Sequence, residues 1–461
     1  MEPNYEESIR KKDSTKAEKT LVPRGALGTA LTRLRSKLPP SLLGYALFCA
    51  FGMGSWVAIN GIWGEISILV QTLPECDRLP SILVVIIQLA NVGPLLYTAT
   101  KAVFAHRRWN QYHLEVVTVA ILVLIGTSAC ILLSLFWSRT AHIFGGPHAV
   151  SLITLTFLLA TVDCTSSVVF FPFMRHFHKD YISALYIGAG LSGVLPSAVA
   201  LAQGFVKYGE GCPGTYSGYA ALGINFSPAV YFVLLTLLTL VCGAAFVLIN
   251  VLPVVRKQMQ TIPARSCHMQ QPERERKEGE ETTATVTNTV PLLAKLVKSK
   301  FTLLLCLAVI NFVSNGALPA ISSYAFLPYG NMYYHTGVNL AIIMSPIASL
   351  LHLFLPSKSE FPLVVLSHLS AFLASYVLMI AMMYPQPLLV GHTAGGVIIV
   401  LVNVAISAMI AYTKVGVTVQ LHSYSEKNLA LTVGGVVNQL GSLIGAMLFF
   451  GLVYYTDIFQ H

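Results

Sequence analysis

Charged side chains are scarce in this chain. Only 11% of its 461 residues are Asp, Glu, Lys or Arg, whereas hydrophobic residues make up 55%. A soluble protein has about a quarter charged residues, and so small a charged fraction cannot cover a water-exposed surface of this size. The alternative surroundings are a lipid bilayer, in which each spanning helix needs about 20 apolar residues. The composition therefore predicts an integral membrane protein.

The sequence also lacks the short motifs that carry most enzyme and cofactor chemistry. It has no P-loop, no His-Glu-x-x-His, no Gly-x-Gly-x-x-Gly opening a helix after a strand, and no Cys/His metal spacing. His176 and His178 are two residues apart, which does not place them on one helical face. We therefore expect no enzyme activity, no metal and no cofactor. The net charge of +9 does not indicate nucleic acid, because most charges flank hydrophobic runs and act as topology signals.

What the sequence does contain is a series of eleven apolar runs, bounded by charges, proline or glycine. They predict an all-α polytopic membrane protein with eleven transmembrane helices. The runs cover about residues 42–70, 79–102, 114–136, 148–174, 182–206, 228–255, 301–323, 332–354, 361–383, 391–413 and 427–454.

Two polar segments divide the chain. Residues 1–41 are of mixed charge, and residues 256–300 are rich in Arg, Glu, Gln and Thr, so neither builds a core. We interpret the first as a disordered cytosolic tail and the second as a flexible cytosolic linker. This leaves a six-helix half over 42–255 and a five-helix half over 301–461. A six-plus-five arrangement with a basic central loop is major-facilitator-like.

The basic residues orient these helices. With the N-terminus in the cytosol, all of the 29 Lys and Arg residues except Arg78, Arg139 and Lys207 fall on the cytosolic side. Such a bias follows the positive-inside rule. We therefore expect a multi-pass protein with a cytosolic N-terminus and an extracellular C-terminus, acting as a monomer in the bilayer.

The first apolar run carries a stripe of aromatic and polar side chains. Trp56, Asn60 and Trp63 are spaced four and three residues apart, which places them on one helical face. Such a stripe is often only packing, but Trp offers a stacking face and Asn both a donor and an acceptor to a planar heterocycle. We predict that Trp56 and Asn60 bind substrate, whereas Trp63 lies nearer the outer interface and suits an aromatic belt.

The seventh run repeats this arrangement. Asn311 stands four residues before an Asn-Gly pair that begins at Asn315, as Trp56 stands four residues before the Asn-Gly pair of Asn60. The matching place at the head of each half favours an internal repeat in which both segments line one site. We therefore predict that Asn311 and Asn315 also bind substrate.

The fourth run holds Asp163, Ser166 and Ser167. A charge at the depth of Asp163 is costly in lipid and needs a partner or a cavity. Three roles stay open for Asp163: proton coupling, substrate binding, or a structural hydrogen bond between helices. We expect Lys414, at the end of the tenth run, to extend its amine to the cytosolic interface.

Two further features fall on the predicted external side. Cys76 and Cys212 both lie there, where oxidation is possible. Two alternatives therefore stay open: a disulfide between them, or two free thiols. Asn225 begins an Asn-Phe-Ser glycosylation sequon directly before Pro228 and the membrane.

Several long motifs carry a resemblance to a known family. They are FGMGSWVAINGIW from Phe51, IQLANVGPLL from Ile87, VDCTSSVVFFPFM from Val162, GLSGVLPSAVALAQG from Gly190 and QLGSLIGA from Gln439. With looser matches at NFVSNGALPA and AYTKV, the chain resembles the eukaryotic riboflavin transporters, solute carrier family 52, over nearly its whole length from about residue 42.

The resemblance implies uptake of riboflavin at the plasma membrane. Riboflavin is a neutral, planar isoalloxazine with an imide edge and a ribityl polyol, so Trp56, Asn60, Asn311 and Asn315 suit its ring, and the hydroxyls of Ser166 and Ser167 suit the polyol. Family members have a cysteine near the position of Phe326, which this chain lacks. If that cysteine normally bonds the one matching Cys212, the resemblance implies that Cys76 takes its place here.

Two other functions compete with this prediction. A carrier of another neutral heterocycle, such as a nucleoside, also fits eleven helices, but the Asp and Arg of the eighth helix in nucleoside carriers are absent from residues 332–354. A membrane receptor without transport is the second alternative, and eleven spans with a linker between two halves do not favour it.

Overall fold

The computed structural model describes residues 41–106, 111–143, 145–174, 176–178, 181–207, 223–256, 271–424 and 427–459. Among these residues, ten segments are long and apolar enough to cross a membrane, and an eleventh is formed when the bent pair of helices at the start counts as one span. The predicted all-α architecture with eleven transmembrane helices is therefore confirmed. The predicted tail, residues 1–41, lies outside the described residues except for Ser41.

The first half is built from helices and one short hairpin. Its helices are α3 (Leu42–Met53), α4 (Val57–Thr72), η1 (Cys76–Arg78), α5 (Leu79–Leu89), α6 (Val92–His106), α7 (Gln111–Phe136), α8 (Val150–Met174), α9 (Tyr181–Gln203), α11 (Pro228–Val251) and the short α12 (Pro253–Arg256). Strands β1 (Ala141–Ile143) and β2 (Gly146–His148) pair antiparallel between α7 and α8.

The second half begins with a long helix and an irregular segment. Its elements are α14 (Gln271–Phe312), the π-helix η2 (Val313–Ala317), α15 (Leu318–Ala320), α16 (Ser322–Phe326), the 3₁₀-helix η3 (Leu327–Tyr329), α17 (Asn331–Phe354), α18 (Phe361–Met382), α19 (Thr393–His422) and α20 (Lys427–Tyr455). α14 thus starts inside the segment expected to be a flexible linker.

The large apolar side chains face two different surroundings. Leu124, Phe372 and Leu401 are each more than 60% exposed although they lie in the middle of long helices. Burying such side chains in water-free surroundings is favourable by roughly 25 cal/mol per Å² of apolar area, so this exposed apolar surface is the face that contacts lipid. The inward faces of the same helices build a shared core around Ile62, Ile66 and other buried residues.

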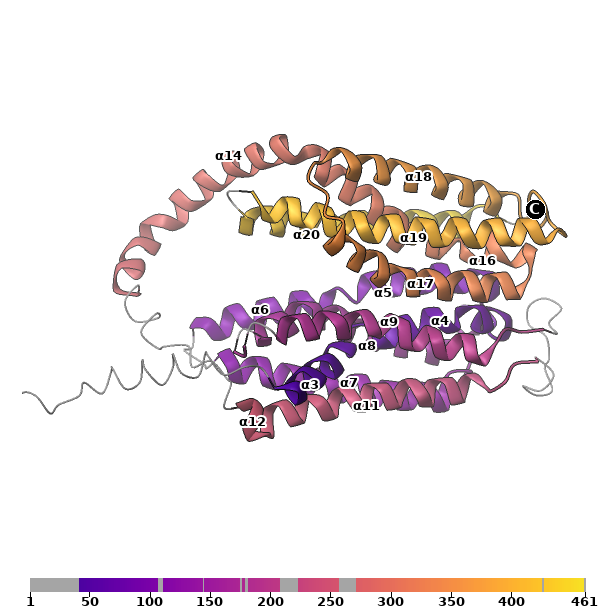
Figure 1. Ribbon diagram of the computed structural model, residues 1–461, viewed down its shortest axis with the longest axis horizontal. Coiled ribbons are helices and arrows are strands. Elements are labelled where there is room, and N and C mark those ends of the chain that lie inside the picture. The colour runs from indigo at the N-terminus through magenta and orange to yellow at the C-terminus, as the bar shows by residue number, and fades with distance from the viewer. Residues whose placement is uncertain are drawn as a thin grey trace, which may run out of the picture.

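The two halves lie side by side (Figure 1). α17 contacts both α9 and α4, and α20 contacts α5, so these helices form the boundary between the halves. We call the end of the bundle that holds η1 the Asp77 end, and the opposite end the Arg256 end. The C-terminus lies at the Asp77 end, where Arg78 stacks over the ring of Tyr454.

Glycine allows close backbone contact inside each half. A Cβ atom added at Gly188 of α9 would overlap the carbonyl oxygen of Cys49 in α3, and one added at Gly52 would overlap the carbonyl of Leu185. Small residues at helix contacts let backbones approach in this way, which is how helices associate in lipid.

The contact at Gly188 makes a stability prediction. Gly188→Ala should destabilise the protein by about 1–3 kcal/mol, because overpacked helices must move apart. The matched control is Gly451→Ala in α20, where an added Cβ meets nothing within 4 Å and the change should stay within about 0.5 kcal/mol. Thermal unfolding of the purified variants measures both, and equal melting temperatures would contradict the prediction.

Candidate functional site

The first transmembrane span is broken in the middle. α3 ends at Met53, α4 begins at Val57, and the two helices are bent by 53° relative to each other. A helix end leaves backbone N–H or C=O groups without partners in the helix, and lipid offers none. Each break in a spanning helix therefore needs polar side chains from its neighbours.

α8 supplies these side chains. The carboxylate Oδ2 of Asp163 accepts a hydrogen bond from the Ile59 N–H at 3.0 Å, in the first turn of α4. The Ser166 hydroxyl lies 2.9 Å from the carbonyl oxygen of Ser55 and 2.7 Å from that of Asp163, and it donates to them. Asp163 is 1% exposed and caps α4 from another helix by accepting a backbone N–H of its first turn. This geometry favours the structural role among the three left open for Asp163.

Trp56 and Asn60 lie at this break. Trp56 is the N-cap residue of α4, and its half-buried side chain makes no capping hydrogen bond. Asn60 is also half-buried, and its Nδ2 donates to the Ser192 hydroxyl of α9 at 3.4 Å. Asn60 lies next to Gly193, which in turn faces Ile342 of α17. The two predicted residues therefore share the first span, and Asn60 is close to the boundary between the halves.

Ser167 differs from its neighbour Ser166. Ser167 is exposed, and its hydroxyl is 3.5 Å from the carbonyl oxygen of Asp163. Ser166 is 1% exposed and is engaged in the break. Of the two predicted serines, Ser167 is thus the one whose hydroxyl is accessible in this conformation.

The seventh span is irregular at the matching place. Its π-helix η2 contains Asn315, whose Nδ2 lies 3.3 Å from Asn311 Oδ1 and 3.0 Å from the Ser442 hydroxyl of α20. Asn311 is fully buried and donates to the Leu307 carbonyl at 2.7 Å. The structure therefore brings Asn311 and Asn315 together, and in this conformation their hydrogen bonds connect the seventh span to α20. The buried Asn311 can act on a solute only indirectly, by positioning Asn315.

Lys414 is placed differently from the sequence-based expectation. Its Nζ donates to the Ser314 hydroxyl of η2 at 3.2 Å instead of extending to the interface. Within the described residues it has no acidic side chain at ion-pair distance. The prediction failed because the irregular backbone of the seventh span, which a periodic pattern does not reveal, places a hydroxyl within reach.

Asp163 and Lys414 occupy corresponding places. α8 is the fourth span of the first half and α19 the fourth of the second, and each sends a charged side chain to the irregular segment of the first span of its own half. Sequence reasoning found the repeat in the first spans but missed it in the fourth ones.

Polar contacts from α17 close the Asp77 end between the halves. The His335 ring lies 2.9 Å from the Ser67 hydroxyl through Nδ1 and 2.9 Å from the Ala200 carbonyl through Nε2. Asn339, one turn further on, donates to the Gly64 carbonyl at 3.0 Å. A ring nitrogen beside a carbonyl must donate, so Nε2 carries the proton and Nδ1 of the neutral ring accepts from Ser67.

The same end is held at two more places. Asn331 of α17 donates to the Val206 carbonyl at 3.1 Å. Asp77 accepts from the Tyr384 hydroxyl at 2.9 Å through its side chain and from the Ser323 hydroxyl at 2.5 Å through its backbone. Asn331, His335 and Asn339 are four residues apart, so a search for polar stripes along the eighth run would have found this face of α17.

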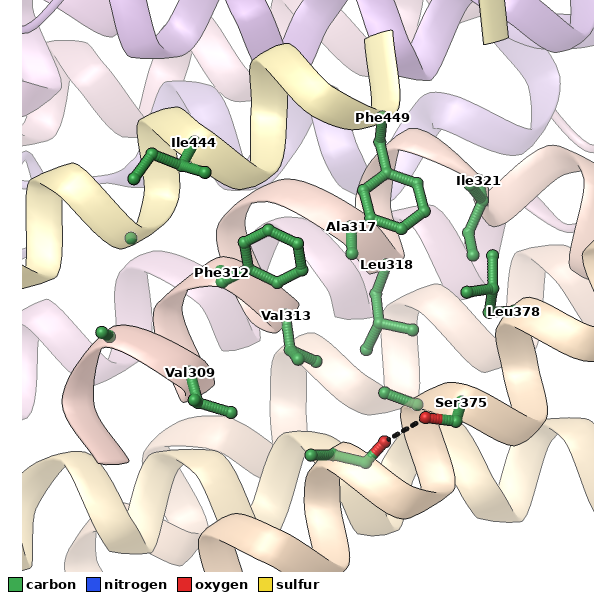
Figure 2. Close-up of a pocket in the computed structure, with 14 residues that line it drawn as sticks. Val309, Phe312, Val313, Ala317, Leu318, Ile321, Ser375, Leu378, Ile444 and Phe449 are labelled. Carbon is green, nitrogen blue, oxygen red and sulfur yellow. Dashed lines mark hydrogen bonds between the residues drawn. The ribbon is translucent and has the colours of Figure 1, made fainter. Parts of the chain in front are cut away.

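A separate groove of about 440 Å³ lies within the second half (Figure 2). Phe312, Val313, Leu378 and Ile444 line it, and its one lining hydroxyl, Ser375, is bonded to the backbone of its own helix. This lining offers no free polar group to an imide or a polyol. The groove is therefore a different feature from the polar site at the helix breaks.

The two external features have separate outcomes. Cys76 is disulfide-bonded, but Cys212 lies outside the described residues, so their pairing stays a prediction. Asn225 is exposed, and its Nδ2 donates to the Ala202 carbonyl at 2.8 Å. The sequon serine, Ser227, also caps α11 by accepting from the Val230 N–H. Glycosylation of Asn225 stays a prediction.

Comparison with solved structures concerns the fold alone. A mutant of the nucleoside transporter NupG superposes with a TM-score of 0.52 at 12% identity, over 90% of this chain and 92% of that one. An auto-inhibited peptide transporter of the POT family gives a TM-score of 0.52 at 14% identity, over 89% of each chain. Both likenesses support the major-facilitator-like arrangement.

Comparison of the sequence with known families and proteins is more specific. Residues 40–461 match the sequence model of the family described as solute carrier family 52, riboflavin transporter. Member 3 of that family from Homo sapiens is 35% identical over 473 residues, covering 91% of this chain and 97% of the relative. Member 3-A from Danio rerio is 37% identical over 440 residues, covering 90% and 96%. The chain belongs to solute carrier family 52, the riboflavin transporters.

Proposed function

We propose that this protein carries riboflavin across the plasma membrane into the cell by alternating access between its two halves. The observation that carries the proposal is the broken first span, whose Trp56 and Asn60 lie at the break close to the boundary between the halves. Discontinuous helices at the junction of two repeats are where such transporters bind their solutes. The names of the relatives support riboflavin as the solute.

The chemistry of the break suits a neutral flavin. The Trp56 indole offers a face for the isoalloxazine ring, and the Asn60 amide offers a donor and an acceptor for the imide edge. Asn315 provides a second amide from the other half, held in place by the buried Asn311. The exposed Ser167 hydroxyl provides a partner for the ribityl chain, whereas Asp163 and Ser166 hold the backbone of the site.

The contacts between the halves support the transport mode. In this conformation α17 seals the Asp77 end against α4 and α9 through His335 and Asn339. The partners of these side chains are hydroxyl and carbonyl groups, so the bonds can be exchanged for bonds to water when the halves rock apart. With the Asp77 end facing the exterior, the conformation closed at that end is the one from which riboflavin leaves into the cytosol.

Uptake of labelled riboflavin tests the proposal. Cells expressing the protein should show saturable uptake that excess unlabelled riboflavin and lumiflavin block and that excess nucleosides leave unchanged. Surface biotinylation, with epitope tags at each terminus, measures plasma-membrane location and orientation in the same cells, and only the C-terminal tag should be accessible from outside. Uptake blocked by nucleosides but not by lumiflavin would instead identify a nucleoside carrier, and no uptake despite surface expression would favour a receptor.

A further inference from the structure

A buried carboxyl and a buried amide face each other between α4 and α9. Glu65 and Gln203 both have 0% exposed surface. The Gln203 amide Nε2 donates to Glu65 Oε1 at 2.9 Å and to the Phe226 carbonyl at 3.1 Å. The second oxygen of each group, Glu65 Oε2 and Gln203 Oε1, has no hydrogen-bond partner among the described residues.

One proton would satisfy both oxygens. An ionised carboxylate can only accept hydrogen bonds and so offers nothing to an amide oxygen, whereas a protonated carboxyl has one O–H donor. We propose that Glu65 binds a proton in this conformation, on Oε2, and donates it to Gln203 Oε1. The acid and the amide then form a ring of two hydrogen bonds, with the amide N–H donating to Oε1 and the acid O–H donating to the amide oxygen.

The surroundings of Glu65 supply no compensating charge. No Lys, Arg or His of the described part of the chain lies within ion-pair distance of its carboxyl. An ionised carboxylate buried without such a partner is costly, and the cost disappears when the group is neutral. The ring with Gln203 would in addition remove two unpartnered buried acceptors.

The other titratable groups on the packed elements are engaged elsewhere. From α11, the Tyr231 hydroxyl donates to the carbonyls of Gly61 and Pro196. From α17, His335 is bonded to Ser67 and Ala200, and from α8, Asp163 caps Ile59. The charged groups of η1 and the residue before it are Glu75, which accepts from the Ala149 N–H, Asp77, which accepts from Tyr384, and Arg78, which stacks over Tyr454.

The position of the pair connects the proton to the closure of the Asp77 end. The Gly64 carbonyl, one residue before Glu65, accepts from Asn339 of α17, and Ala200 of α9 lies beside Gly64. When α17 separates from α4 and α9, the pair is opened toward the compartment at the Asp77 end. Sealing an ionised Glu65 under α17 is unfavourable, so this end closes once Glu65 has taken up a proton.

The proton binds and leaves on the same side. It comes from the aqueous phase at the Asp77 end, forms the O–H bond at Glu65 Oε2 before closure, and returns to that phase when the end reopens. Acid outside therefore speeds closure and with it uptake. This inference rests on the proposed alternating access, and it adds the group whose protonation permits one of the two states.

The first test compares pH profiles of uptake. Glu65→Gln keeps the shape of the protonated acid, because the new amide can donate to the Gln203 oxygen. Wild-type uptake should rise about threefold or more as the outer pH falls from about 8 to about 5.5, whereas uptake by the variant should vary by less than about 1.5-fold. The matched control is Glu115→Gln, the same change at a buried Glu bonded to His176 at the Arg256 end, and it should keep the wild-type profile. A Glu65→Gln variant that keeps the wild-type profile would overturn the proposal.

The second test needs no riboflavin and so separates this inference from the proposed function. Ala200→Cys places a thiol at a position that is 0% exposed until the Asp77 end opens. Labelling by a membrane-impermeant thiol reagent should rise with outer pH more steeply in the wild-type background than in the Glu65→Gln background, since thiol ionisation affects both equally. Equal slopes of labelling against pH in the two backgrounds would refute the protonation of Glu65, even if riboflavin is transported. Unequal slopes without riboflavin uptake would refute only the proposed solute.

Discussion

Replacing Asp163 with leucine is expected to abolish uptake. Leucine is similar in size but accepts no hydrogen bond, so the Ile59 N–H in the first turn of α4 would be left buried without a partner. An orphaned buried donor costs about 1–3 kcal/mol. Because this N-terminus carries Trp56 and Asn60, its movement would displace the site, and uptake should fall at least about a hundredfold.

Asn is the matched control at the same position. Asp163→Asn keeps an oxygen that can accept from Ile59, so uptake should stay within about threefold of wild type once its amide has turned correctly. Initial rates of riboflavin uptake, normalised to surface abundance, measure both variants. Two outcomes contradict the capping role: normal uptake by the leucine variant, or an asparagine variant as inactive as leucine. The second would return Asp163 to the proton-coupling role that the sequence left open.

The number of spans could be predicted from sequence because lipid makes a simple demand. Each crossing helix needs an unbroken apolar run, and runs such as 114–136 correspond closely to α7 (Gln111–Phe136). The break at Gly54–Trp56 could not be predicted in this way, since it falls within a single apolar run. A bend of 53° also depends on the side chains that α8 offers to the freed backbone.

The polar residues of the site were predictable only one helix at a time. Asp163 was found because a charge is costly in lipid, Asn60 because of its spacing within one helix, and Asn311 because of the repeat. None of these arguments requires knowledge of the partner residues. The partners are far apart in the chain: Asp163 bonds to Ile59 and Gln203 to Glu65. A helical period relates residues within one element, so it predicts no pairing between elements.

The same limit explains why Trp56 and Asn311 turn out unlike each other. They hold matching places in the repeat, but Asn311 is fully buried and Trp56 is half-buried. In the seventh span the π-helix turns the Asn315 amide toward Ser442 of α20, whereas in the first span the chain breaks before Asn60. The repeat therefore relates corresponding segments of the two halves, whereas the irregularity of each segment depends on the neighbouring helices.

Asn60→Ala should lower riboflavin uptake at least about tenfold while surface abundance stays normal. The change removes a donor and an acceptor, each contributing about 0.5–1.5 kcal/mol to a bound neutral group, and about 1.4 kcal/mol corresponds to tenfold. Among the described residues the Asn60 side chain makes one weak hydrogen bond, 3.4 Å to Ser192, so folding should be little affected. The loss should appear as a raised KM if the amide holds riboflavin equally in both conformations.

Ser192→Ala separates binding from packing at this position. It removes the same hydrogen bond but leaves the Asn60 amide in place, and it should change uptake by less than about threefold. If both variants lose uptake equally, uptake depends on the hydrogen bond between Asn60 of α4 and Ser192 of α9. Asn60 would then position the two helices instead of binding the imide edge of riboflavin. If Asn60→Ala alone loses uptake, the loss should be smaller for a flavin that is methylated at the imide nitrogen. Such a flavin has already lost the imide N–H from which the Asn60 amide oxygen would accept a hydrogen bond. A smaller loss would therefore show that the amide contacts the imide edge directly.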